Sequence, residues 1–161
     1  MNRKKDENDR PMVLIVDTQK DDIESTLAYA YSGNREMPFS FKTVSTIDSA
    51  IKELKRRSYS LVLASEFLPE DIVGVNIDEL YMRDDLLRLL EFLLGTNNPT
   101  RVCVISALFI VDTQEELYGS YPSVVGMFGR YYDERKLMAI RKIIRQYVPA
   151  PEKTKRTGEA V

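Results

Sequence analysis

Short apolar runs alternate with amphipathic segments along most of the chain, and this alternation limits strongly how the chain can fold. Five segments have the length and composition of strands: MVLIVD, FSFKTVS, YSLVLAS, RVCVISA and SVVGMFG. Segments with apolar residues at helical spacing follow them, such as TIDSAIKELKRR, DDLLRLLEFLLG and DERKLMAIRKIIRQY. The pattern predicts a series of β/α units.

Strands that are apolar on both faces are typical of a parallel sheet covered by helices on both sides. Right-handed crossovers between such strands produce a doubly wound α/β domain. Within the helix that begins near residue 47, Thr46 is expected to cap the amino end and Asp48 to lie near its positive pole. Gly95 and the following Asn-Asn-Pro are expected to stop the next strongly apolar helix. A short helix is expected in DTQEELYGSY.

The two ends of the chain differ in composition from the region between them. Residues 1–10 and 149–161 are polar and charged without apolar periodicity, so we expect both to be disordered. The folded domain is predicted to span residues 11–148. No DNA-binding or catalytic region is expected beside it.

Composition argues against several classes of protein. A net charge of −2 predicts no general attraction to nucleic acid or to anionic membranes. No apolar stretch approaches the roughly 20 residues that span a bilayer, and MNRKKDENDR lacks the apolar core of a signal peptide, so a cytoplasmic protein is expected. The chain has no histidine and one cysteine, Cys103, expected to be a buried thiol. We therefore expect no enzyme activity, metal site or cofactor.

Polar residues follow the predicted strands at the edge where open α/β sheets bind their ligands. They are Asp17 and Thr18 after the first strand, Ser65 and Glu66 after the third, Ser106 and Ala107 after the fourth, and Arg130 after the fifth. Because the carboxyl ends of parallel strands meet at one edge, these residues are expected to converge.

These positions resemble those of the receiver domain of bacterial two-component response regulators, the CheY-like family, over residues 12–147. In that family the first strand ends in two acids that hold Mg²⁺, and VLIVDTQ has Asp17 followed by Thr18. The third strand carries the phosphoaccepting aspartate of a D-x-x-L-P pattern, and SEFLP has Ser65 at that place. The resemblance implies a flavodoxin-like three-layer sandwich with a five-stranded sheet in the order 2-1-3-4-5.

The last two strands continue the resemblance. Ser106 and Ala107 match a Thr/Ser-Ala pair, and GMFGR is similar to a G-Y-L-x-K pattern. Gly126 is in place, Met127 stands where a switch aromatic often lies, and Arg130 replaces the lysine. The chain is thus similar to a degenerate receiver that lacks its phosphoacceptor aspartate.

The loss of that aspartate changes the expected chemistry. A neutral hydroxyl has a high pKa and here no base to activate it, so Ser65 is a poor phosphoacceptor and is expected to cap a turn. Asp17 alone offers Mg²⁺ one strong ligand, so binding should be weak or absent. Glu66 is expected to point away from the side that Ser65 faces. Asp17 either binds backbone N–H groups or pairs with Arg130, and the pairing with Arg130 is the favoured of the two. Ser106 is expected to hydrogen bond to nearby backbone.

Two features suggest contacts with other proteins. The apolar connection at 70–83 is roughly ten residues longer than usual, and it either folds over its own domain or forms an interface. In receiver domains the last helix-strand-helix face commonly docks partners or a second copy, and aromatic residues are favoured in such interfaces. A protein partner or a homodimer is therefore expected. The candidate interface residues are Tyr81, Met82, Tyr118, Tyr121, Met127, Tyr131 and Tyr132.

The sequence thus favours a stand-alone pseudo-receiver that acts in bacterial signal transduction through phosphorylation-independent protein–protein interaction. A first alternative is an atypical phosphorylatable regulator that uses Asp17 and another acid. A second is a flavodoxin-like module that binds a small molecule or nucleotide. The second is disfavoured because DTQKDD is acidic and lacks the glycines that cradle phosphate.

Overall fold

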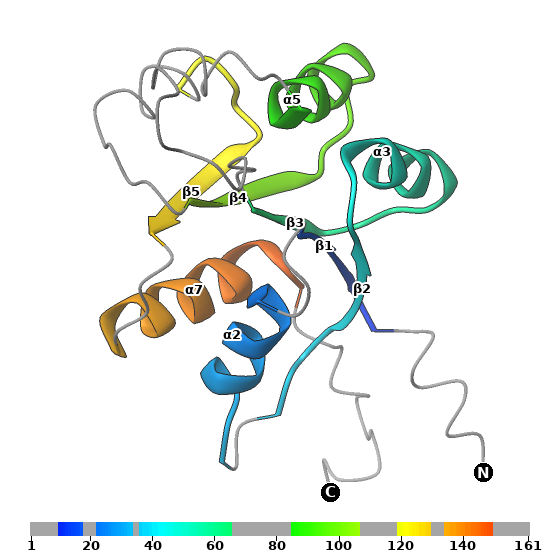
Figure 1. The fold of residues 1–161 in the computed structure, drawn as a ribbon. Coiled ribbons are helices and arrows are strands. Elements are labelled where there is room, and N and C mark those ends of the chain that lie inside the picture. The colour runs from blue at the N-terminus through cyan, green and yellow to red at the C-terminus, as the bar shows by residue number, and fades with distance from the viewer. Residues whose placement is uncertain are drawn as a thin grey trace, which may run out of the picture.

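The computed structural model describes residues 10–17, 22–33, 36–65, 85–106, 119–129 and 134–149. Strands and helices alternate through these ranges (Figure 1). They are β1 (Met12–Val16), α2 (Asp22–Ala30), β2 (Ser40–Val44), α3 (Ile47–Arg56), β3 (Leu61–Ser65), α5 (Asp85–Gly95), β4 (Arg101–Ser106), β5 (Val124–Gly129) and α7 (Glu134–Tyr147). The predicted disordered ends, apart from residues 10 and 149, and the 70–83 connection lie outside these ranges. So does most of DTQEELYGSY.

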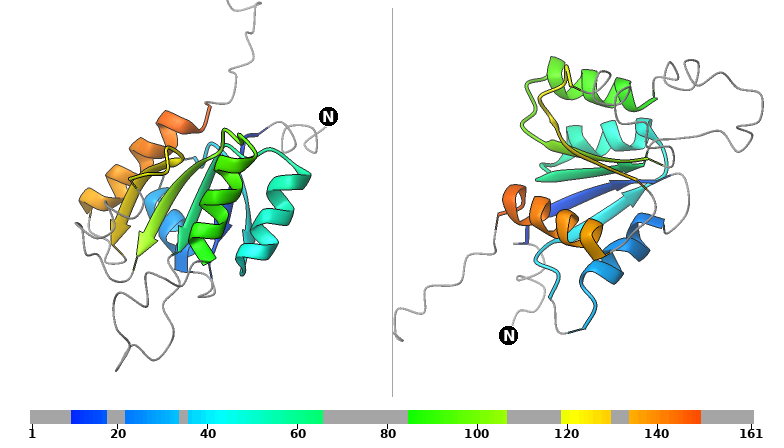
Figure 2. Two further views of the ribbon diagram at one scale, coloured as in Figure 1. Left: turned by 90° about the horizontal axis from the view of Figure 1, so that it is seen from above. Right: turned by 90° about the vertical axis from the view of Figure 1, so that its left-hand side faces the viewer.

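The strands form one parallel five-stranded sheet in the order β2-β1-β3-β4-β5. Helices α3 and α5 cover one face, and α2 and α7 cover the other (Figures 1 and 2). The doubly wound α/β fold and the strand order predicted for this chain are confirmed.

Alternation along the strands divides the apolar residues between two cores. In β1, Leu14 and Val16 pack toward α3 and α5, while Val13 and Ile15 pack toward α2 and α7. β1 and β3 lie inside the sheet, which explains why β1 is apolar throughout and β3 is apolar up to Ser65. β2 is an edge strand, and its burial alternates along its length.

The ends of α3 follow the sequence prediction. Thr46 Oγ1 accepts a hydrogen bond from the backbone N–H of Ser49 at 3.1 Å, and Asp48 lies in the first turn.

The end of α5 differs in detail from the prediction. Gly95 is the last helical residue, but the left-handed residue is Asn97, with φ of 51°. The N–H of Asn98 donates to the carbonyl of Leu93 at 2.9 Å, and the N–H of Asn97 donates to that of Leu94 at 3.2 Å. This is the Schellman arrangement, in which asparagine takes the place usual for glycine.

An irregularity in β5 determines which side chains face α7. Val102 pairs with Val124 but Cys103 pairs with Gly126, so Val125 is an extra residue in a β-bulge. Val125 packs with the cluster on the α7 side, and a Cβ added to Gly126 would also point there. Two successive residues therefore face α7, and the second of them, Gly126, has no side chain to place there.

Candidate functional site

The register of the sheet brings together the described residues that were predicted to converge. Val16 pairs with Ala64, so Asp17, the next residue, lies level with Ser65. The N–H of Asp17 donates to the carbonyl of Val44 at 3.0 Å and extends the ladder by one residue. Ser106 ends β4, two strands from β1. Thr18, Glu66, Ala107 and Arg130 lie outside the described residues, as does the side chain of Ser106.

Asp17 is buried at this edge, with 4% of its surface exposed. Its Oδ2 accepts a hydrogen bond from the backbone N–H of Ile23 at 3.0 Å. Ile23 is the second residue of α2, so the carboxylate lies at the positive end of that helix. Of the two roles left open for Asp17, the binding of backbone N–H groups is therefore present. The other, a pairing with Arg130, involves a residue outside the described ranges.

Ser65 is buried almost completely, with 1% of its surface exposed. Leu63 belongs to the cluster that faces α2 and α7, and alternation places Ser65 on the same side of β3. Its Oγ has no hydrogen-bond partner among the groups that the structure describes, so the expected turn cap is not found there. A small neutral hydroxyl therefore lies in the interior at the carboxyl end of β3.

The donor set at this edge fits a divalent cation poorly. A hard cation such as Mg²⁺ requires several oxygen ligands with negative charge. Among the described side chains here only Asp17 carries charge, and one of its oxygens already accepts a backbone hydrogen bond. Within the described ranges no group of three or more His, Cys, Asp or Glu residues could hold a metal ion.

Two of the candidate interface residues, Tyr121 and Met127, are described. Both are half-buried and pack against the cluster on the α3 and α5 side. Tyr121 also donates a hydrogen bond from its hydroxyl to Glu91 Oε1 at 2.6 Å. These two side chains therefore contribute to the packing of the domain itself. Tyr81, Met82, Tyr118, Tyr131 and Tyr132 lie outside the described residues.

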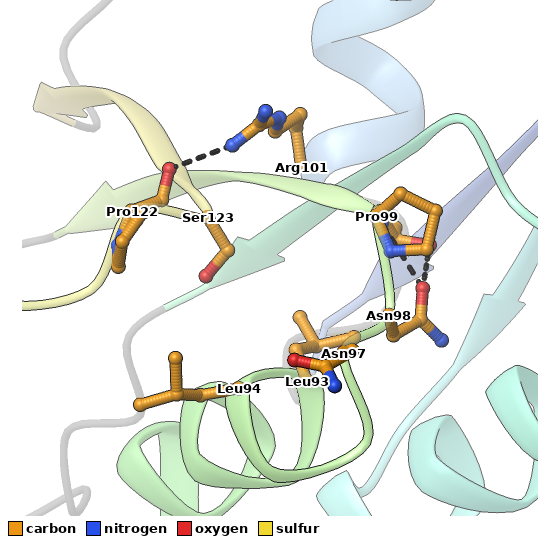
Figure 3. A pocket seen from close by; sticks show the side chains of 9 residues that line it. Leu93, Leu94, Asn97, Asn98, Pro99, Arg101, Pro122 and Ser123 are labelled. Atoms are coloured by element: carbon orange, nitrogen blue, oxygen red, sulfur yellow. Dashed lines mark hydrogen bonds between the residues drawn. The ribbon is translucent and has the colours of Figure 1, made fainter.

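A pocket lies at the opposite edge of the sheet, between the end of α5 and the starts of β4 and β5 (Figure 3). Its apolar wall includes Leu93, Leu94 and Pro122. Arg101 donates to the carbonyl of Pro122 at 2.9 Å, and Asn98 Oδ1 accepts from the backbone N–H of Thr100 at 3.0 Å. These hydrogen bonds of Arg101 and Asn98 join the backbone segments that line the pocket, so both side chains have a structural role there.

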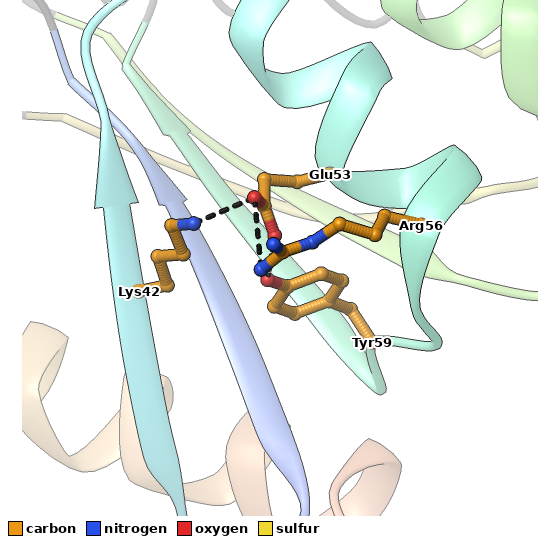
Figure 4. Close-up of polar contacts among 4 residues, drawn as sticks. All are labelled: Lys42, Glu53, Arg56 and Tyr59. Atoms are coloured by element: carbon orange, nitrogen blue, oxygen red, sulfur yellow. Dashed lines mark hydrogen bonds and ion pairs between the residues drawn. The ribbon is translucent and has the colours of Figure 1, made fainter.

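A polar cluster surrounds Glu53 on the inner side of α3 (Figure 4). The residue is 8% exposed, and its carboxylate accepts hydrogen bonds from Lys42 Nζ at 2.6 Å and from the Tyr59 hydroxyl at 2.7 Å. Arg56 lies 3.4 Å from the same carboxylate. The hydrogen bonds from Lys42 and Tyr59 lower the pKa of Glu53. The sequence pattern could have revealed this residue, because Glu53 falls between Ala50 and Leu54 on the apolar face of its helix.

The same cluster predicts how stability depends on alkaline pH. Burial, together with the hydrogen bond to Glu53, raises the pKa of Tyr59 from 10.0 to about 12. The Tyr59 hydroxyl therefore loses its proton at a lower pH in the unfolded chain than in the folded one. The free energy of unfolding consequently falls as pH rises from 10 toward 12. Urea unfolding at several pH values should show a steeper loss for the wild type than for Tyr59→Phe, by ~1 kcal/mol per pH unit. Parallel curves would contradict the assignment.

Cys103 is buried in β4, and burial raises the pKa of its thiol to about 12. The prediction that this thiol is buried is confirmed. None of the helices in the described ranges is long and apolar enough to cross a membrane.

Comparison with known proteins places this geometry in context. No family model matches the chain, and no curated protein matches it. The signal receiver domain of an HD domain-containing protein from Pseudomonas fluorescens Pf-5 superposes with a TM-score of 0.61 at 18% identity, covering 86% of this chain and 97% of that one. A CheY-like receiver domain protein from Methanospirillum hungatei JF-1 has a TM-score of 0.60 at 12% identity, covering 86% and 96%. The chain has the receiver fold.

A further receiver structure is the beryllofluoride-activated NtrC4 receiver domain dimer, with a TM-score of 0.59 at 18% identity, covering 84% of this chain and 98% of that one. At these identities the likeness concerns the fold. Within the receiver fold, the buried carboxylate of Asp17 and the buried hydroxyl of Ser65 lie at the carboxyl edge of the sheet. Sequence reasoning located both residues but did not foresee that the Ser65 hydroxyl would lack a described partner.

Proposed function

We propose that the chain is a cytoplasmic pseudo-receiver that acts in bacterial signal transduction. It works through protein–protein interaction that does not depend on phosphorylation, and it has no enzyme activity of its own. The observation that carries the proposal is Ser65, which stands at the carboxyl end of β3 with 1% of its surface exposed. A neutral hydroxyl buried there lacks both the charge and the access that phosphoryl transfer requires.

Asp17 supports the same proposal. Its carboxylate binds the N–H of Ile23 and so helps to fix the start of α2. This hydrogen bond connects the carboxyl end of β1 to α2 without any bound ligand. A constitutive shape then carries the signal, and partners read it from the surface. We propose that partners bind the last helix-strand-helix region, with Tyr118, Tyr131 and Tyr132 as candidate contacts. Tyr121 and Met127, which are half-buried on the α3 and α5 side, would contribute through the parts that stay exposed. Tyr81 and Met82 are proposed to contribute from the 70–83 connection.

The alternative of an atypical phosphorylatable regulator makes a different prediction for Mg²⁺. An amide-resolved NMR titration with Mg²⁺ and then beryllofluoride, which imitates an aspartyl phosphate, separates the two. We expect the amides of Asp17, Ser65 and Ser106 to remain in place at millimolar Mg²⁺ and after beryllofluoride. If the chemical shifts of these amides change together with those of β5 and α7, and Asp17→Asn abolishes the change, the chain is a phosphorylatable switch and the pseudo-receiver proposal is wrong. A receiver domain with its phosphoacceptor aspartate, titrated in parallel, serves as the positive control.

A further inference from the structure

Helix α7 carries the largest net charge of the helices that the structure describes. Between Glu134 and Tyr147 it has three arginines and two lysines against one glutamate, a net charge of +4, whereas the whole chain has −2. The apolar residues Leu137, Ile140 and Ile144 are buried against the sheet. The charge therefore lies on the flanks and the outer face of the helix.

Four side chains form a line along that outer face. Arg135, Met138, Lys142 and Arg145 follow one another at intervals of three or four residues, which places them one above the other on a helix. All four are exposed, and Met138 is 57% exposed. We call these four residues the α7 stripe. It extends about 15 Å, since a helix rises about 1.5 Å per residue.

Several cations elsewhere in the described ranges pair with acids. Lys42 and Arg56 pair with Glu53, Arg88 pairs with Asp48, and Arg10 pairs with Glu36. In the part of the chain that the structure describes, Arg135, Lys142 and Arg145 form no ion pair. Neighbouring Arg141 instead donates to the carbonyl of Ala30 at 2.8 Å. The stripe thus presents three cations around one exposed apolar side chain.

We propose that the α7 stripe docks an acidic helix of a protein partner. That helix would place an apolar residue on Met138 and carboxylates one turn to either side, opposite Arg135 and Lys142. Three turns of a partner helix match the length of the stripe. The inference rests on the proposed function, because it assigns a chemistry to the partner of the pseudo-receiver.

Two features favour a protein over other anionic partners. Met138 lies within the row of cations, and a phosphate backbone would make no use of an apolar side chain there. A membrane-binding helix needs a broad apolar face, and Met138 is the only large apolar side chain exposed on α7. The net charge of −2 for the chain also opposes general attraction to nucleic acid or anionic lipid.

Binding to a synthetic three-turn helical peptide tests the proposal on the full chain. The peptide carries a leucine with glutamates one turn before and after it, and a matched peptide has glutamines instead. Measured by fluorescence anisotropy, the glutamate peptide should bind at least about tenfold more tightly than the glutamine peptide. In NMR spectra it should shift the amides of α7. Met138→Ala should weaken binding about threefold to tenfold.

Charge reversal with a matched control decides whether the stripe itself is responsible. Lys142→Glu/Arg145→Glu should weaken binding about tenfold, whereas Lys52→Glu/Lys55→Glu on α3, which changes the net charge equally, should leave it within about twofold. Equal losses in both variants, or equal binding of the two peptides, would overturn the proposal. So would binding of duplex DNA or phosphatidylserine vesicles through these residues as tight as that of the glutamate peptide.

The outcome is separable from that of the proposed function. Peptide binding is measured without Mg²⁺ and read on α7 amides, whereas the phosphorylation test is read at Asp17 and Ser65. A Mg²⁺-dependent switch would overturn the pseudo-receiver even if the peptide binds. A silent Mg²⁺ titration without peptide binding would overturn only the acidic partner.

Discussion

Ser65→Asp should lower the free energy of unfolding by about 2–4 kcal/mol in the presence of EDTA. Position 65 is 1% exposed and lies level with Asp17, which is 4% exposed, so the change places two carboxylates side by side in the interior. Each disfavours the ionised form of the other, and burial adds a desolvation cost. Millimolar Mg²⁺ should restore about 1 kcal/mol, because a second acid supplies part of the missing charge. Urea unfolding with EDTA and with Mg²⁺ measures both effects.

Ser65→Asn is the matched control, because it has nearly the same shape as the aspartate variant but no charge. Its stability should be lower than that of the wild type for reasons of packing alone and should not respond to Mg²⁺. If the aspartate and asparagine variants are equally stable in EDTA, charge repulsion at this edge is absent and the structural basis of the pseudo-receiver proposal weakens. If the wild type itself gains stability from Mg²⁺, Asp17 already holds the ion with other groups.

The sheet was predictable because its strands combine apolar runs with regular intervening helices. β1 is apolar at every position and β3 at every position before Ser65, and only a strand inside a sheet with both faces covered requires this. The location of Asp17 and Ser65 followed from the same rule, since each residue directly follows or ends such a strand. Their partners did not follow, because hydrogen bonds such as that from Ile23 depend on how the first turn of α2 meets the strand.

Local backbone detail was less predictable than topology. Gly95 looked like the residue that ends α5, but Asn97 takes the left-handed conformation, and both residue types are permitted there. The bulge at Val125 was also not foreseen, because the run Val-Val-Gly-Met-Phe-Gly shows no feature that marks one residue as extra. Its consequence is measurable at Gly126.

Gly126→Ala should destabilise the domain by about 1–2 kcal/mol. A Cβ at this position would lie 2.5 Å from Cδ1 of Ile143 on α7, closer than carbon atoms approach without displacement. The bulge causes this contact by turning Val125 and Gly126 toward the same helix. Ile143 must then change rotamer or α7 must move outward, and either response loses packing. Urea unfolding of the single variant measures the cost.

The partner atom in this contact can be removed separately. Ile143→Val deletes Cδ1 and should cost about 0.5–1 kcal/mol alone. In that background Gly126→Ala should cost at least about 0.5 kcal/mol less than in the wild type, which a double-mutant cycle detects as coupling. Gly95→Ala is the control, since nothing lies within 4 Å of the added methyl group, and it should leave stability unchanged or slightly higher. Additive costs for positions 126 and 143 would show that the methyl groups do not meet, and the placement of β5 against α7 would then be wrong. Coupling would instead establish that position 126 contacts Ile143, as the packing of β5 against α7 requires.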